Sequence, residues 1–245
     1  MSIIQTSDFV GEVQISKNKF TAADLQAYID RVEEDVLKQL LGDTLYLAFK
    51  ADSFGNDAGS RDRYKELLNG LEYTNPDDSS LTVAYMGLKR MLRLFIYAEY
   101  LPNQLYNNTI IGEVEGSSRN AFNTAVSKVN ETAEDRQRMG VDLYDSAQTF
   151  ISDYNDKEYN PSSIVDQTGD VYLVSVSSTK YLQNGDTIDI NGVDYVVSNI
   201  ITDTSFEISE TSGTVFPADA TVKFELYPTY KGIKKAKVFF RGMTF

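Results

Sequence analysis

The sequence contains no histidine, no cysteine and no tryptophan among its 245 residues. Without cysteine, the chain can form no disulfide framework, no thiolate nucleophile and no zinc–sulfur site. Without histidine, it lacks the most common metal ligand and the usual general base near neutral pH. Much of the common catalytic repertoire is therefore excluded, including the Ser-His-Asp triad.

Motifs for nucleotide and calcium binding are also missing. The chain has no G-x-x-x-x-G-K-[ST] loop, and no G-x-G-x-x-G follows a strand-like segment. The acidic loops at Asp52 and Asp153 fail the D-x-[DN]-x-[DN]-G calcium pattern, because Phe54 and Lys157 stand where oxygen ligands are needed. Two carboxylates could still serve a glycosidase, but spacing selects no pair among 36 acids. The sequence therefore predicts no enzyme, no cofactor and no metal site.

The bulk composition is that of a folded, soluble protein. Apolar residues make up 42% and charged residues 24% of the chain, close to ordinary globular proteins. The start of the chain lacks the basic flank and apolar core of a secretory signal, so we expect synthesis and folding in a cytoplasm. The formal net charge is −13, which argues against broad wrapping of nucleic-acid phosphates.

The positive charge is concentrated at the C-terminus. Residues 231–245, KGIKKAKVFFRGMTF, hold five bases and no acid, whereas the rest of the chain holds 18 bases and 36 acids. A free tail would expose its apolar side chains to water, so we expect this arm to dock on its own body or on a neighbouring subunit, where it could extend a sheet. The candidate interface residues in this arm are Lys234, Lys235, Lys237, Phe239, Phe240, Arg241 and Phe245.

The first 165 residues are dominated by helical patterns. Apolar residues at spacings of three and four predict an amphipathic helix over 21–42, with Gly42 just past its end. A short extended arm precedes it. Further helices are expected at about 60–69, over 81–101 until Pro102 stops the helix, and over 117–154, where Gly140 marks a break or hinge.

The segment 81–101, LTVAYMGLKRMLRLFIYAEYL, contains a single acid. Its basic residues leave no run of about twenty apolar residues, so it does not predict a membrane span. We expect a mostly buried helix with a charged seam that is solvated, pairs with Glu33 or Glu34 of the first helix, or contacts a partner. The seam consists of Lys89, Arg90 and Arg93.

The character of the sequence changes after residue 165. Five short segments of β-type pattern predict strands at 171–176, 186–190, 193–198, 204–208 and 221–227. Asn191-Gly192 between two of them is a strong hairpin signal. Their spacing predicts a small five-stranded, barrel-like module over 166–228. As an alternative function, this module could bind glycan or peptide through Tyr172, Tyr181, Tyr195 and Tyr227.

The order of the helical elements resembles a known family. An N-terminal arm leads into 25-LQAYIDRVEEDVLKQLLGDTLYLAF-49, and a loop and a basic-apolar helix ending in 97-YAEYLPNQ-104 follow. After the bridge 109-TIIGEVEG-116, a long helix closes with 143-LYDSAQTFISDYN-155. Over residues 1–160 this order is similar to that of the head-tail connector (adaptor, ring) proteins of tailed bacteriophages, such as those of crAss-like phages.

The resemblance implies a structural virion protein at the head-tail junction, made in the host cytoplasm. Such proteins form homo-oligomeric rings, here a dodecamer, that bind the portal protein and other tail or ring proteins. Genomic DNA passes through their channel without specific binding, no membrane is involved, and nothing is catalysed. The expected fold is α+β, with a helical connector domain over 1–165, the β module over 166–228 and a basic-apolar C-terminal arm over 229–245.

Overall fold

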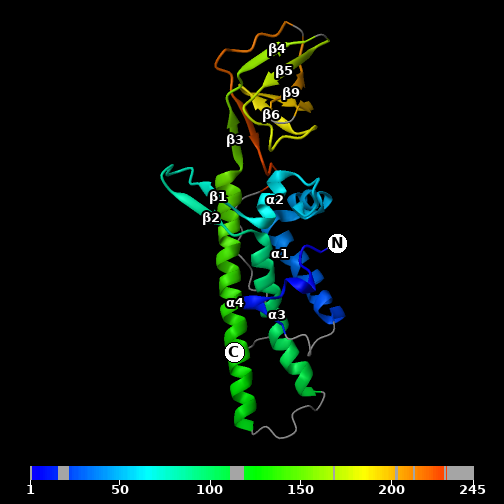
Figure 1. The fold of residues 1–245 in the computed structure, drawn as a ribbon, viewed down its shortest axis with the longest axis vertical. Helices are drawn as coiled ribbons and strands as arrows, with labels where there is room; N and C mark the ends of the chain where they lie inside the picture. Colours follow the sequence, from blue (N-terminus) through cyan, green and yellow to red (C-terminus); the bar gives the residue numbers. More distant parts are fainter. Residues whose placement is uncertain are drawn as a thin grey trace. The chain divides into compact units, whose positions relative to one another are not determined.

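The computed structural model describes residues 2–15, 22–110, 119–167, 169–201, 204–211, 213–228 and 230. Contacts divide these residues into two compact units (Figure 1). The helical unit holds the described residues of 1–60 and 64–150 together with Tyr230, and the β unit holds those of 61–63 and 151–228. The predicted α+β class is confirmed.

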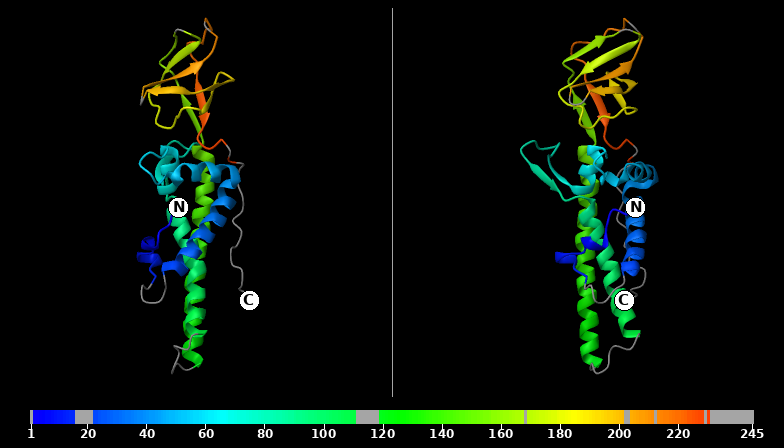
Figure 2. Two further views of the ribbon diagram at one scale, coloured as in Figure 1. Left: turned by 90° about the vertical axis from the view of Figure 1, so that its right-hand side faces the viewer. Right: turned by 45° about the vertical axis from the view of Figure 1, so that its right-hand side comes forward.

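The helical unit is built from four helices, three short 3-10 turns and one hairpin. The helices are α1 (Ala22–Ala51), α2 (Asp62–Asn69), α3 (Leu88–Ile110) and α4 (Arg119–Tyr154). The 3-10 turns are η1 (Thr6–Asp8), η2 (Gly11–Val13) and η3 (Ser53–Gly55), and the hairpin pairs β1 (Leu71–Thr74) with β2 (Thr82–Tyr85). Figures 1 and 2 show α3 and α4 as long helices side by side. The first two residues of α2 and the last four residues of α4 belong to the β unit.

The pattern that predicted the first helix is confirmed. The apolar stripe that shares one face of α1 is fully buried: Leu25, Ile29, Val32, Val36 and Leu40. Gly42 leaves helical geometry with φ 75° and ψ 161°, a conformation that only glycine adopts without strain. The first helical segment therefore ends where the sequence indicated, and a second segment continues to Ala51.

Two predictions about α3 were wrong. The helix begins at Leu88, because Gly87 has φ 80° and the preceding residues Thr82–Tyr85 pair as strand β2. The helix also continues past Pro102 to Ile110. Pro102 offers no N–H to the Ala98 carbonyl one turn earlier. The Asn103 side chain donates to the next carbonyl along the helix, that of Glu99, at 2.8 Å.

The predicted break at Gly140 is also wrong, because α4 runs through this residue. A Cβ atom at Gly140 would lie 3.2 Å from the ring of Phe95 on α3. Glycine thus allows the two long helices to approach closely. This packing offsets the roughly 1 kcal/mol that glycine costs in a helix interior.

The β unit contains two four-stranded antiparallel sheets. One has the order β3 (Asp156–Tyr159), β10 (Val222–Glu225), β6 (Thr187–Ile190) and β7 (Val193–Val196). The other has the order β4 (Ser163–Asp166), β5 (Val171–Ser175), β9 (Ser205–Ser209) and β8 (Ser198–Ile201). Alternate residues of these strands are buried, among them Val174, Ile188, Phe206, Ile208 and Val222.

This topology corrects the prediction of a five-stranded, barrel-like module. Each predicted segment contains a strand, namely β5, β6, β7, β9 and β10, but β3, β4 and β8 are added and no closed barrel forms among the described residues. The chain passes from β7 to β8 through Val197 alone, so one extended run serves both sheets. Periodicity within such a run cannot show that its two halves pair with different neighbours. Strand β3 also lies before residue 166, at which the sequence placed the start of the module, and β4 ends at this residue.

Candidate protein interaction site

The N-terminal arm, residues 2–15, is packed against the helical unit. The sequence predicted an extended arm, but the chain instead forms the two 3-10 turns η1 and η2. Five of its apolar side chains are buried, whereas Val10 is 60% exposed; the buried ones are Ile3, Ile4, Phe9, Val13 and Ile15. Each Å² of apolar surface that is buried stabilises the packed state by about 25 cal/mol, so these buried side chains contribute most to holding the arm in place.

A buried carboxylate of α1 fixes the start of this arm. Glu33 accepts the backbone N–H of Ile3 at 3.0 and 2.9 Å and that of Ile4 at 3.0 Å. Burial raises the pKa of the Glu33 carboxyl, and the two N–H donors oppose that rise. Beside it, the Ser2 hydroxyl donates to Asp30 at 2.6 Å and lowers the pKa of that carboxyl. Glu33 therefore serves the backbone of the arm rather than a basic side chain.

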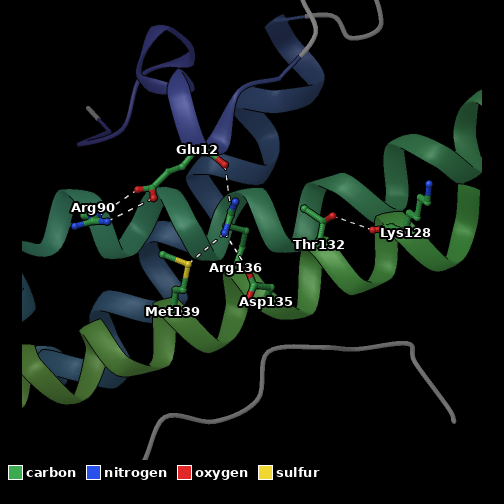
Figure 3. Close-up of polar contacts among 7 residues, drawn as sticks. All are labelled: Glu12, Arg90, Lys128, Thr132, Asp135, Arg136 and Met139. Carbon is green, nitrogen blue, oxygen red and sulfur yellow. Dashed lines mark hydrogen bonds and ion pairs between the residues drawn. The ribbon is translucent and has the colours of Figure 1, made fainter.

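The basic seam of α3 holds the second half of the arm. Lys89 pairs with Asp8 at 3.1 Å, and Arg90 contacts both carboxylate oxygens of Glu12 at 3.2 and 3.4 Å. Figure 3 shows that Arg136 of α4 reaches the same arm residue, donating to the Glu12 carbonyl at 3.2 Å. Side chain and backbone of one residue are thus held by two different helices.

The expected pairing of the seam with the first helix is wrong. Glu33 holds the arm, and Glu34 pairs with Lys38 one turn along its own helix. Distance along the sequence hid the actual partners, because the arm acids lie about 80 residues from the seam. Since Lys89 and Arg90 remain about one-third exposed, each pair contributes at most about 1 kcal/mol.

The third base of the seam behaves differently. The Arg93 side chain is half-buried, and its Nε is buried without a hydrogen-bond partner in the described part of the chain. A subunit contact through the seam remains a prediction. Arg136 was not singled out by the sequence, because a single arginine in a mixed-charge helix gives no pattern that distinguishes it.

The β1–β2 hairpin is the second surface that bears on interaction. Tyr85 stacks on Phe150 with ring centroids 4.2 Å apart, and Tyr73 meets the same ring at 5.5 Å. The Tyr85 hydroxyl donates to the Leu67 carbonyl at 2.9 Å. At Gly70, where φ is 87°, a Cβ would lie 2.2 Å from the Tyr85 carbonyl oxygen, so only glycine fits. The base of the hairpin is therefore firmly anchored.

Away from its base the hairpin is open. Glu72, Thr74, Thr82 and Ala84 are exposed on one face, and Leu81 at the tip is 50% exposed. The sequence analysis missed this hairpin because the apolar run after residue 81 has helical spacing. The turn residues N-P-D-D-S-S between LEYT and TVAY were the signal that could have identified it.

The C-terminal arm lies outside the described residues apart from Tyr230. This includes all of its candidate interface residues: Lys234, Lys235, Lys237, Phe239, Phe240, Arg241 and Phe245. Tyr230 lies near Tyr144 of α4: burial, with a smaller contribution from Tyr230, raises the pKa of the Tyr144 hydroxyl to about 12. The start of the arm is thus next to α4.

The tyrosines proposed for ligand binding in the β unit are mostly core residues. Tyr172, Tyr195 and Tyr227 are buried, and the Tyr227 hydroxyl donates to the Arg63 carbonyl at 2.8 Å. Only Tyr181 is half-exposed, and its hydroxyl lies 2.7 Å from that of Tyr154. These positions offer little surface for a glycan or peptide.

Within the described residues, no group of three or more acidic side chains could hold a metal ion, and no helix is long and apolar enough to cross a bilayer. Neither the curated proteins nor the solved structures include a match to this chain. One family does match: residues 37–169 correspond to DUF6712, described as a family of unknown function. Because this match covers more than half of the sequence, the chain belongs to the DUF6712 family.

Proposed function

We propose that this chain is a structural subunit of the head-tail connector of a tailed bacteriophage. Copies would form a ring that joins portal to tail and extends the channel for DNA ejection. The observation that supports this most is the order of elements in the helical unit. A packed N-terminal arm, the two-segment helix α1 and the long pair α3 and α4 follow in the order on which the resemblance rests.

The charge distribution supports a passive channel wall. The chain without residues 231–245 has a formal charge of −18, from 18 bases and 36 acids. An acidic surface repels phosphates, so DNA would pass without being gripped. In this proposal the protein catalyses nothing and binds no cofactor, and its place is the virion at the head-tail junction.

Three kinds of partner follow from the proposal. The chain would contact further copies of itself in a ring, which the resemblance makes a dodecamer. It would also contact the portal protein and other tail or ring proteins. The basic C-terminal arm supplies charge opposite to the acidic body for such contacts. The partly exposed bases of the α3 seam are a second candidate contact.

Electron microscopy of the purified protein with the portal protein of the same genome tests this proposal. We expect a closed ring of this chain, coaxial with the portal and absent when the portal is omitted or when Lys234, Lys235 and Lys237 are changed to Glu. Mixtures with duplex DNA at physiological salt should show no stable complex. A chain that stays monomeric and never binds portal would contradict the proposal.

A further inference from the structure

Among the residues that the structure describes, the β1–β2 hairpin is a two-stranded sheet without a third strand. An isolated two-stranded hairpin is at best marginally stable in water, and unpaired edges readily accept another strand. Here the register from Leu71↔Tyr85 to Thr74↔Thr82 uses one side of each strand, so each retains an open outer edge. The anchored base on Phe150 keeps these edges in place without covering them.

The hairpin also has a uniform charge. Residues 71–85 hold Glu72, Asp77 and Asp78 and no base. Asp78 organises the tip by accepting the N–H and hydroxyl of Ser80, at 3.0 and 2.7 Å. Glu72 and Asp77 are exposed. A strand added here would therefore meet carboxylates at both the base and the tip.

One segment of the chain has the matching chemistry. Residues 231–245 hold five bases and no acid, and they include the strand-forming run Val238-Phe239-Phe240. Opposite charges on neighbouring strands stabilise pairing, whereas like charges oppose it. The rest of the chain has twice as many acids as bases, so this is the segment with the strongest charge complementarity to the hairpin.

The tail also starts close enough to reach it. Tyr230 lies near Tyr144, and Phe150, under the hairpin, follows six residues later on the same helix. Six helical residues span about 9 Å. Fifteen residues in extended conformation reach about 50 Å. Length therefore places no restriction on pairing within one chain, and a neighbouring copy could donate the same segment.

We propose that the basic segment 231–245 adds a strand to an open edge of the β1–β2 hairpin. Backbone hydrogen bonds supply the pairing, and lysines of the segment meet Glu72 and Asp77. The inference does not depend on the phage role, because it concerns contacts that this chain can make with itself.

The absence of native cysteine permits a clean cross-linking test in the full chain. Thr74→Cys on β1 or Thr82→Cys on β2 is combined with Val238→Cys, and disulfide formation is followed under mild oxidation. Both threonines are exposed, so the folded chain should tolerate these changes. The matched control pairs Val238→Cys with Val193→Cys, a 49% exposed position of β7. We expect on the order of tenfold more cross-link from a hairpin pair than from the control.

Two additional experiments distinguish the possible outcomes. In mixtures of single-cysteine variants, intermolecular cross-links mean donation by a second copy, whereas cross-links confined to the double variant mean pairing within one chain; either supports the inference. Changing Glu72 and Asp77 to Lys should lower the yield about fivefold, because opposite charges become like charges. Equal yields for both hairpin pairs and the control pair, at correct folding by circular dichroism, would overturn it. If the chain forms rings on portal but gives no such cross-link, the strand-pairing inference fails while the proposed function stands.

Discussion

Two hairpins of this protein, β1–β2 and β6–β7, have opposite surroundings. Strand β6 is paired on both sides, with β7 and β10, and its Ile188 and Ile190 lie in the core of the β unit. The β1–β2 hairpin has no neighbouring strand in the described part of the chain, and the ring of Phe150 holds its base. One hairpin is stabilised by its sheet, the other by an aromatic anchor. The second arrangement leaves backbone edges free for a further strand.

Removing the anchor should produce the largest effect. Phe150→Ala takes away the ring on which both Tyr73 and Tyr85 rest, and we expect a loss of about 3–5 kcal/mol in unfolding free energy. Phe150→Leu, which retains most of the volume, should cost less than about 1.5 kcal/mol. Denaturant unfolding followed by circular dichroism measures both. A loss below 1 kcal/mol for the alanine variant would show that the hairpin base is not a main stabilising contact.

Equivalent glycine substitutions in the two hairpins sharpen the contrast. Gly70→Ala places a Cβ 2.2 Å from a backbone oxygen at φ 87°, so we expect a loss of about 2–4 kcal/mol. Gly192→Ala in the β6–β7 turn has the same φ of 87° but open space around the Cβ. Only backbone strain of about 1 kcal/mol remains there. Equal losses in thermal or denaturant unfolding would contradict the close contact at Gly70.

The N-terminal arm is also held by a buried group, the Glu33 carboxylate, whose protonation should make stability depend on pH. Because burial raises the pKa of Glu33 in the folded chain, the folded state holds its proton more tightly than the unfolded state. Unfolding free energy should therefore fall as pH rises from the ordinary value of 4.5 through the folded-state pKa, by at most about 1.4 kcal/mol per pH unit. Glu33→Gln should remove this slope.

Asp30→Asn is the matched control for the arm, with the opposite sign. The hydrogen bond from Ser2 lowers the pKa of Asp30 below 3.8, so its contribution is present above that pH and is lost as pH falls through the folded-state pKa. The two variants thus change the stability profile in different pH windows. Unfolding curves between pH 3 and 7 that are parallel for wild type and Glu33→Gln would rule out a buried, proton-binding Glu33.

Substitutions in the α3 seam should have the smallest effect on folding. Arg90→Gln removes a partly exposed pair with Glu12, at a cost of about 0.2–1 kcal/mol. Arg93→Gln serves as the comparison, because Arg93 forms no ion pair in the described part of the chain. If either change leaves folding intact but abolishes ring assembly, the seam is a subunit contact. Unfolding of both variants would show instead that the seam acts only within the chain.

Local patterns predicted much of the helical unit. The stripe from Leu25 to Leu40 and the end of its segment at Gly42 follow directly from spacing and from the freedom of glycine. Gly140 shows the limit of such reasoning, because its role depends on Phe95 across a helix interface. No local pattern distinguishes a glycine that breaks a helix from one that admits a neighbouring ring.

Long-range pairing could not be predicted in either unit. The five strand segments of the β unit were recognisable from alternation, and Asn191-Gly192 adopts the two positive φ values that its turn requires. Which strands pair depends on contacts remote in sequence, as does the pairing of Arg90 with Glu12. The acids beside the seam therefore had to be found in three dimensions.

Hydrogen exchange of the two hairpins in the full chain tests most directly whether the open edges of β1–β2 are used. The wild type is compared with a variant in which Lys234, Lys235 and Lys237 are changed to Glu. Our account predicts that backbone amides of residues 71–85 lose protection in the variant, whereas those of 187–196 keep it. Identical exchange of residues 71–85 in both proteins would contradict the pairing of the basic tail with this hairpin.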